Sequence, residues 1–477
     1  MMNLAKLSIH KSLAPDKHLV INLASDKDLD RLHLSKVEQD YVKERVKSDE
    51  TLIALNRINQ HVFIILQKKT GTDSQGLESY RKLGHTVYQH AKTHRITSLG
   101  IQISNTALAY AFAEGLLLST YEFLKYKTDT KKHTYRLAEV LFSEQGMNKT
   151  SLQKLQTLVE ATFMARNWVN EPNSYLTARV FASSMKEACE SAGCDVQVFD
   201  KKEIEKMKMG GLLAVNQGSV EPPTFTRIEW KPKKARNKKP VVLVGKGVVY
   251  DTGGLSLKPT PHSMDYMKSD MAGGAAVAAA LYALAKLNAD VYVIGLIPAT
   301  DNRPGGAAYA PGDVVKMMNG LHVEVLNTDA EGRMILADAL AYSEQFKPEL
   351  VINAATLTGA ALRAIGTYGS VAMGTASPDV FAKLKSVGEG CYERLVEFPF
   401  WSEYDDEIKS EVADIKNLGS DLAGAITAGK FLAHFTKSPF VHLDIAGPSY
   451  LHKASSYRTS GGTGVGVRLF TEFLLSY

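Results

Sequence analysis

Apolar and polar positions along residues 1–150 switch repeatedly between the period of a strand and the period of a helix. Short apolar runs at 17–25, 61–67 and 98–104 predict strands. Residues 34–48, 79–94 and 106–127 have helical spacing. This alternation is typical of a small α/β domain.

A longer helix is predicted after this first region. Residues 151–170 place Leu152, Leu155, Leu158 and Val159 on one side, and the pattern stops at the breaker Glu171-Pro172. We therefore predict an N-terminal α/β domain at 1–150, a linker helix at 151–172 and a larger domain at 173–477.

The larger domain shows the same alternation with more strongly apolar strands. Its fold class is therefore predicted to be α/β, with a sheet covered by helices on both faces. Strands are predicted at 213–216, 241–245, 291–297, 350–354 and 440–445, and helices at 177–192, 269–287 and 334–346.

The one compositionally biased segment is KPKKARNKKP, residues 231–240. It stands between two strand-like runs, TFTRIEW and VVLVGKG. A solvated hairpin turn is a simpler interpretation of this segment than a nucleic-acid contact.

Composition excludes several classes of protein. With 45% hydrophobic and 22% charged residues, the chain has the make-up of a globular protein. A formal charge of +5 over 477 residues gives little reason to expect nucleic acid or membrane as a partner. Three cysteines without a CxxC argue against a disulfide framework or a thiolate metal site. No signal peptide or membrane span is apparent, so we expect a cytoplasmic protein.

Charged residues cluster where a strand-like run meets a predicted helix. NTDAEGR, residues 327–333, follows HVEVLN and places Asp329, Glu331 and Arg333 on a strand-to-helix connection. Ligands bind at such connections in open α/β sheets. A turn, a favourable helix dipole and an ion pair would explain this segment equally well when it is taken by itself.

Two further segments also carry charged residues at the end of a predicted strand or the start of a predicted helix. GKGVVYDTGGLSLKP carries Lys246, Asp251 and Lys258 after the strand VVLVG, and Asp270 stands at the start of a nearly apolar helix. Together with NTDAEGR they offer four carboxylates, and carboxylates crowded together repel unless protons or cations compensate them. A pair of divalent metal ions is the simplest compensation.

Other kinds of site are less well supported. The sequence has no HExxH, and GKG at 245–247 lacks the spacing of a phosphate-binding loop. GGTGVG at 461–466 also misses the dinucleotide-binding register. His90 and His94 share one helix face, but a solvated helix surface explains them more simply.

Four motifs in order, GKGVVYDTGGLSLKP, MKSDMAGGAA, NTDAEGR and NAATLTGA, resemble the leucyl aminopeptidase family of dinuclear metallo-aminopeptidases, the M17 type. NTDAEGR is the most specific of them. The resemblance runs from about residue 165 to the C-terminus, whereas residues 1–150 match the family only in size and α/β character.

The resemblance implies a two-domain α/β fold, with a mixed central sheet flanked by helices in a catalytic metallopeptidase domain at 173–477. It implies release of the N-terminal residue, preferably an apolar one such as Leu, from short peptides. Family members usually form hexamers, so a homo-hexamer is expected.

The resemblance also assigns site residues. Two metal ions would be held by Lys246, Asp251, Asp270, Asp329 and Glu331, with Asp251 and Glu331 bridging them. The family keeps its catalytic side chains at Lys258, which would stabilise the oxyanion, and at Arg333, which would hold a bicarbonate. By motif position the substrate pocket would include Met267, Thr356, Gly359 and Ala446.

The ligand types bear on the identity of the metal. Carboxylates alone would favour Mg²⁺ or Mn²⁺, but an amine ligand shifts the preference toward Zn²⁺, Co²⁺ or Mn²⁺. A lysine can bind a metal only as the neutral amine, which two neighbouring dications would favour. We therefore expect zinc or manganese.

Two other functions are compatible with parts of the pattern. A DNA-binding architectural protein would use KPKKARNKKP, although the nearly neutral charge balance argues against it. A catalytically inactive relative kept as a scaffold is disfavoured, because all seven metal-binding and catalytic motif residues are present.

Overall fold

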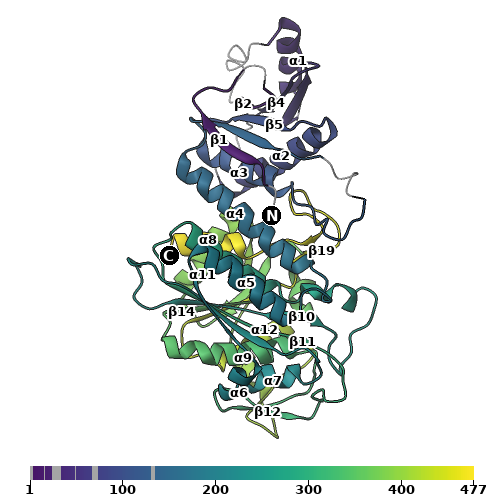
Figure 1. Cartoon of the computed structure of the whole chain (residues 1–477), viewed down its shortest axis with the longest axis vertical. Coiled ribbons are helices and arrows are strands. Elements are labelled where there is room, and N and C mark those ends of the chain that lie inside the picture. Colours follow the sequence, from purple (N-terminus) through teal and green to yellow (C-terminus); the bar gives the residue numbers. More distant parts are fainter. Residues whose placement is uncertain (1–3, 15–16, 24–33, 49, 67–72, 130–134) are drawn as a thin grey trace. The chain divides into compact units, whose positions relative to one another are not determined.

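The computed structural model describes residues 4–14, 17–23, 34–48, 50–66, 73–129 and 135–477 (Figure 1). The chain forms two compact units, residues 1–160 with 454–459 and residues 161–453 with 460–477. The division falls inside helix α4 (Lys149–Asn170). The domain boundaries 1–150, 151–172 and 173–477 remain a prediction.

The N-terminal unit is built on a six-stranded sheet. Its order is β1-β6-β5-β2-β4-β3, and all neighbours are parallel except the pair β3 and β4. The strands are β1 (Lys6–His10), β2 (Leu19–Leu23), β3 (Leu52–Asn56), β4 (His61–Leu66), β5 (Ser98–Gln102) and β6 (Glu139–Ser143). The predicted strands correspond to β2, β4 and β5, although residues 24–25 and 67 lie outside the described residues.

In the described part of this unit, the sheet is accompanied by α1 (Lys36–Val46), α2 (Ser74–Thr93), α3 (Thr106–Leu118) and the first part of α4. The helix predicted at 106–127 is shorter than expected. The hydroxyls of Ser119 and Thr120 donate to the carbonyls of Gly115 and Leu117 at 2.7 and 2.8 Å, and such local bonds compete with further helix.

The larger unit contains a nine-stranded mixed sheet. The order is β16-β15-β18-β14-β9-β11-β8-β7, and β10 also pairs with β11. Strands β11, β9, β14 and β18 run parallel, so their carboxyl ends meet at one edge. The strands are β7 (Asp195–Phe199), β8 (Thr224–Trp230), β9 (Val241–Gly245), β10 (Gly247–Asp251), β11 (Val293–Asn302), β14 (Leu350–Ala355), β15 (Ser370–Gly374), β16 (Leu395–Glu397) and β18 (Phe440–Asp444).

Helices cover both faces of this sheet, as expected from the apolar strands (Figure 1). One face carries α5 (Ala178–Ala192), α8 (Ala272–Lys286) and α13 (Val467–Leu475), with α11 (Pro378–Cys391) packed against α13. The other face carries α7 (Gly210–Asn216), α9 (Glu331–Ser343) and α12 (Gly424–Ala433). Within the described ranges, no helix is both long and apolar enough to cross a membrane.

Smaller elements complete the unit. They are α6 (Lys201–Lys206), α10 (Gly359–Ile365), the 3-10 helices η3 (Met264–Ser269), η4 (Glu344–Phe346) and η5 (Ser402–Ile408), and the short strands β12 (Val314–Lys316), β13 (His322–Glu324), β17 (Ile415–Lys416), β19 (Tyr450–Leu451) and β20 (Gly461–Gly462).

The strand predicted at 213–216 is wrong, because these residues form the second half of helix α7. A short apolar run has no periodicity that separates a buried strand from a buried helix. Packing decides the matter here, since α7 is buried against α9 and β11.

The hairpin predicted around 231–240 is also wrong. Strands β8 and β9 do not pair with each other, because β11 lies between them, antiparallel to β8 and parallel to β9. The connection is largely exposed, as expected, but Asn237 is buried and its side-chain amide donates to the carbonyl of Tyr292 at 2.9 Å.

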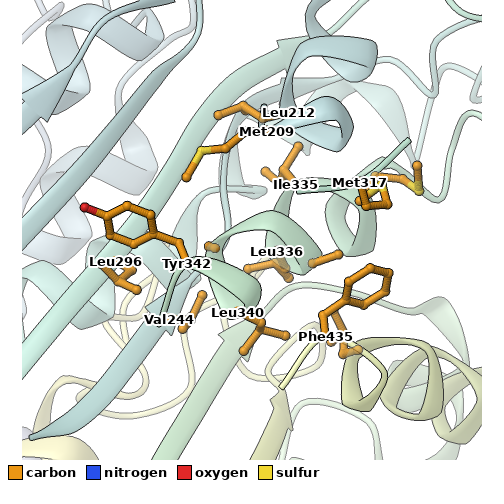
Figure 2. Packing of buried hydrophobic residues seen from close by; sticks show 14 of the residues in the cluster. Met209, Leu212, Val244, Leu296, Met317, Ile335, Leu336, Leu340, Tyr342 and Phe435 are labelled. Atoms are coloured by element: carbon orange, nitrogen blue, oxygen red, sulfur yellow. The ribbon is translucent and has the colours of Figure 1, made fainter. Parts of the chain in front are cut away.

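A dense apolar core lies where α7 and α9 meet the sheet (Figure 2). Leu336 and Leu340 of α9 are completely buried, as is Leu212 of α7. Tyr342 meets Phe225 of β8 edge to face, with ring centres 4.9 Å apart. This packing holds the first turn of α9, which carries Glu331, in a defined position against the strands.

Shortening a side chain in this core should destabilise the larger unit. We expect Leu336→Ala to lower the free energy of unfolding by about 2–5 kcal/mol, since it removes buried contacts and leaves a cavity. Urea denaturation followed by circular dichroism, at a fixed metal concentration, measures this. Leu422→Ala, at a side chain that is 77% exposed, is the control and should have little effect; equal losses would contradict the assignment of the core.

A buried histidine lies between two central strands. His442 of β18 is fully buried, and its Nδ1 lies 2.6 Å from the side-chain oxygen of Asn353 on β14. Burial, together with the nearby positive charge of Arg333, lowers the pKa of His442 to about 3. The folded protein therefore holds this imidazole neutral at pH values where an unfolded chain would protonate it.

This difference predicts an acid sensitivity. The pKa of His442 is lower in the folded protein than its ordinary value of 6.5. His442 therefore has no effect on the free energy of unfolding above pH 6.5, and it lowers that free energy progressively as the pH falls toward 3. The cost approaches about 1.4 kcal/mol per pH unit. The stability difference between wild type and His442→Asn should narrow between pH 7 and pH 4 in denaturation experiments; parallel profiles would contradict the pKa shift.

Candidate active site and metal centre

The site lies at the edge of the sheet where the parallel strands end. Lys246 directly follows β9, Thr356 directly follows β14, and Asp251 is the last residue of β10. Ligands of open α/β sheets bind beyond the carboxyl ends of the strands. The chain thus brings its charged motifs together by its topology, although they are far apart in sequence.

Lys246 forms the buried half of the cluster. Its Nζ lies 2.8 Å from Asp270 Oδ1 and 2.8 Å from Glu331 Oε1. All three side chains are almost completely buried. Burial by itself lowers the pKa of Lys246, but the carboxylates of Asp270 and Glu331 outweigh it and raise that pKa above its ordinary value.

Lys258 forms the more open half. Its Nζ lies 2.9 Å from Asp251 Oδ2 and 2.5 Å from Asp329 Oδ1. Asp251, Asp329 and Glu331 each offer a carboxylate oxygen, and these oxygens lie within 4.8 Å of one another. Three acids at this separation can share one or two cations.

The charges within the cluster do not balance. Four carboxylates face only two ammonium groups, which leaves two negative charges in a largely buried place. Burial, with the neighbouring charges of Asp251 and Glu331, raises the pKa of Asp329 to about 7. Burial likewise raises the pKa of Asp270 well above its usual range. Both shifts show that this protein environment disfavours the ionised acids unless further cations are present.

The oxygens fit divalent metal ions. Asp270 Oδ2 is buried and has no hydrogen-bond donor among the described residues. Glu331 Oε1 and Asp329 Oδ1 lie at ion-pair distance from lysines but receive no directional hydrogen bond. Buried carboxylate oxygens without directional donors, beside a lysine amine, make up a ligand set suited to such ions.

Neutral groups orient the acids. The side-chain amide of Asn302, at the end of β11, donates to Asp251 Oδ1 at 2.8 Å, and the backbone amide of Gly253 donates to the same oxygen at 2.8 Å. The hydroxyl of Thr356 donates to Asp270 Oδ1 at 2.7 Å. Sequence reasoning missed Asn302, since no motif marks it and only the pairing of β10 with β11 brings it near Asp251.

Steric crowding explains why position 332, in the motif NTDAEGR, is a glycine. A Cβ atom on Gly332 would lie 2.7 Å from Lys246 Nζ and 2.5 Å from its Cε. Real Cβ contacts are not that short, so any side chain at this position would displace the lysine. Gly332 lets the first turn of α9 approach Lys246 and bring Glu331 to it.

Arg333 follows Glu331 by two residues on α9 but does not line the cavity described below. It is buried on α9, its Nη1 donates to the carbonyl of Asn417 at 2.8 Å, and its Nε has no acceptor among the described residues. Burial, against the opposing charges of Glu331 and Asp444, lowers the pKa of Arg333 to about 10. The guanidinium therefore remains charged near neutral pH and has a donor available for an anion.

A cavity of about 520 Å³ opens beside the cluster. Ten of the eleven site residues expected from the sequence line it, and Arg333 does not. The four expected pocket residues, Met267, Thr356, Gly359 and Ala446, are among the ten. The cavity is thus bounded by the acid cluster on one part of its wall and by mainly uncharged groups elsewhere.

Asp444 ties two walls of the cavity together. Its carboxylate accepts hydrogen bonds from the hydroxyl of Thr358 at 2.7 Å and from the amides of Leu357 and Ala446 at 3.2 and 3.1 Å. Burial raises the pKa of Asp444 to about 6. The turn after β14 and the turn after β18 are thereby fixed relative to each other.

Other lining residues escaped sequence reasoning. Tyr266 stacks on Tyr450 with ring centres 5.9 Å apart, and His452 packs edge to face on Tyr266 at 4.8 Å. Arg363 of α10 also lines the cavity. These residues belong to no motif, and only the folded chain brings them to the same wall.

Comparison with known proteins agrees with this geometry. Residues 163–471 match the catalytic domain of the cytosol aminopeptidase family, and residues 71–130 match its N-terminal domain. A probable cytosol aminopeptidase of Geobacter sulfurreducens is 46% identical over 76% of this chain and 73% of its own length. One of Chlorobaculum parvum is 41% identical over 85% of each chain.

Solved structures show the same fold over nearly the whole chain. The bottromycin maturation enzyme BotP in complex with Mn has a TM-score of 0.84 and 29% identity, covering 97% of this chain and 99% of its own. A mutant of tomato leucine aminopeptidase has a TM-score of 0.86 and 26% identity, covering 99% and 97%. The α/β fold class, with two domains and a mixed sheet, is confirmed. The chain therefore belongs to the cytosol aminopeptidase family, the leucyl aminopeptidase or M17 type, and is a metal-dependent aminopeptidase.

Proposed function

We propose that the protein releases an apolar, Leu-like residue from the N-terminus of short peptides by means of two divalent metal ions. The observation that carries this proposal is the meeting of four carboxylates and a buried lysine at one end of a 520 Å³ cavity. Burying a cluster of this kind costs free energy unless a cation binds to it.

Five side chains would hold the ions. They are Lys246, Asp251, Asp270, Asp329 and Glu331, with Asp251 and Glu331 shared between the two positions. Lys246 would serve as the neutral amine, because only that form has a free electron pair. When bound, the ions polarise the scissile carbonyl and acidify a water molecule.

Lys258 would stabilise the oxyanion that develops on the scissile carbonyl. Burial lowers its pKa, but Asp251, Glu331 and Asp329 outweigh this and raise it above the ordinary value, so the side chain keeps its charge. Its Nζ also lies at the open half of the cluster, where the side chain retains 13% exposure and can reach a bound peptide. A fixed ammonium aimed at a developing negative charge lowers the barrier to the reaction.

Arg333 would hold a bicarbonate, which supplies a proton carrier when bound. The support is its buried, charged guanidinium, whose Nε has no acceptor in the described part of the chain. A carbonate-like anion matches the planar donor geometry of arginine.

The rest of the cavity supports the substrate preference. Met267 and Ala446 offer apolar surface, Thr356 lies on the turn that follows β14, and Gly359 is the first residue of α10. An apolar side chain of the substrate would lose water contact there without leaving a charged group unpaired.

Two kinds of ion are proposed, zinc and manganese. The mixed set of carboxylates and one amine suits both. BotP, whose solved structure contains Mn, is similar to this chain over nearly its whole length, which adds support for manganese.

Activity should depend on the metal and on Lys258. An amino-acyl anilide such as leucine p-nitroanilide should be hydrolysed after Mn²⁺ or Zn²⁺ is added, and chelation should abolish the reaction. We expect Lys258→Ala to lower kcat by about 100- to 1,000-fold, because a charge stabilising the transition state is lost. Lys286→Ala, at an exposed lysine outside the cavity, is the matched control and should retain activity. Full activity of metal-free protein would refute the proposal.

Metal content tests the ligands separately from catalysis. Atomic emission of purified, metal-soaked protein should detect two ions per chain in wild type and fewer in Asp329→Ala. The variant removes an oxygen donor from the group of three acids. An unchanged ion count would remove Asp329 from the ligand set.

Assembly is the remaining part of the proposal. We propose that the protein forms a homo-hexamer, because members of the family usually assemble in this way. We also propose that it acts in the cytoplasm. Analytical ultracentrifugation should detect a species six times the 52.2 kDa mass of one chain. A monomer at micromolar concentration would contradict it.

A further inference from the structure

One cation on the cavity wall differs from all the other charged lining residues. Lys246, Lys258 and the four acids are engaged in ion pairs with one another. Arg363, which is exposed and lines the same cavity, has neither a hydrogen bond nor an ion pair with any residue that the structure describes. Its positive charge is therefore available to a ligand.

The guanidinium lies over Gly359, the first residue of α10. A Cβ atom on Gly359 would meet Arg363 Nη1 at 3.1 Å, so the guanidinium covers the bare backbone of that glycine. Both residues line the cavity, and they belong to the same short helix, α10. A larger residue at position 359 would crowd the arginine away from this place.

Chain geometry sets an upper limit on the distance between the Arg363 guanidinium and the acid cluster. The hydroxyl of Thr356 donates to Asp270, and Gly359 follows Thr356 by three residues, which can span at most about 11 Å. The path to the guanidinium then adds the Cα–Cβ bond at position 359 and 3.1 Å from that Cβ to Arg363 Nη1. With the side chain and the 2.7 Å hydrogen bond that link Thr356 to Asp270, the guanidinium lies within roughly 20 Å of the cluster. An extended peptide covers about 3.3–3.6 Å per residue, so this limit corresponds to peptides of up to about five residues.

We propose that Arg363 is a substrate-binding residue that recognises a carboxylate of the peptide, above all its C-terminal carboxylate. This inference rests on the proposed function, in which the metal centre receives the N-terminal end. A short peptide with its amine at the acid cluster has one anionic group that every such peptide shares, the α-carboxylate. Arginine pairs with carboxylates through two parallel hydrogen bonds, which makes it suited to this task.

A purely structural role predicts something different. Arg363 lies in the last turn of α10, where a positive charge favours the helix dipole. Loss of that effect would lower the thermal stability and affect every substrate alike. Recognition of a carboxylate instead predicts a change that depends on the charge at the end of the substrate.

The experiment compares three peptides with wild type and variants under saturating Mn²⁺. The peptides are Leu-Gly-Gly, its C-terminal amide, and the amide of Leu-Asp-Gly. We expect Arg363→Gln to raise KM for Leu-Gly-Gly about tenfold, as for loss of a charged hydrogen-bonded pair, with kcat and the KM of the amide nearly unchanged. Arg363→Lys should have a smaller effect, because it keeps the charge.

Controls separate the possible outcomes. Arg179→Gln removes an exposed arginine outside the cavity and should leave all KM values unchanged. An increase confined to the amide of Leu-Asp-Gly would support carboxylate binding but assign it to an acidic side chain. Equal changes in KM for all three peptides, or no change in any of them, would overturn the inference, whether or not the thermal midpoint falls. If wild type cleaved no peptide at all, the proposed function would fail, and the role of Arg363 with it.

Discussion

The burial of four carboxylates around two lysines is the constraint on which the rest of the larger unit depends. Acids this close repel one another, and each buried charge loses its hydration. Positive charges and a hydrogen-bond donor partly compensate the acids. Lys246 and Lys258 contact two acids each, and the side-chain amide of Asn302 donates to Asp251. The remaining excess of negative charge is what suits the cluster to dications. Burial, with a further contribution from the neighbouring acids, raises the pKa values of Asp270 and Asp329.

Such a cluster requires a rigid support, and the parallel strands supply it. Lys246 extends the end of β9, while Glu331 opens α9, whose apolar face is packed into the core between α7 and the sheet (Figure 2). The absence of a side chain on Gly332 lets these two elements approach. Asp444 then joins the turns after β14 and β18, so the substrate cavity and the acid cluster are built on the same set of strand ends.

Much of this arrangement could be predicted from hydrophobic pattern and motif. Apolar runs identified β2, β4, β5, β9, β11, β14 and β18, because strands buried on both faces are apolar throughout. The same reasoning failed at 213–216, where three apolar residues and Asn216 belong to helix α7. It also failed at 231–240, because β11 lies between β8 and β9, the two strands that this segment connects. Both failures concern contacts between segments far apart in sequence, which local periodicity does not contain.

Residue types and their spacing alone therefore specified which side chains are chemically able to form a metal centre, and that they stand at the ends of strands. Only tertiary contacts decided which acid meets which lysine, that Asn302 orients Asp251, and that Arg363 is left as a free cation on the cavity wall among the described residues. The physical reason is that burial and Coulomb interactions depend on distance in space. An aspartate in a motif shows its ligand chemistry, but its charge state and its partners are properties of the folded neighbourhood.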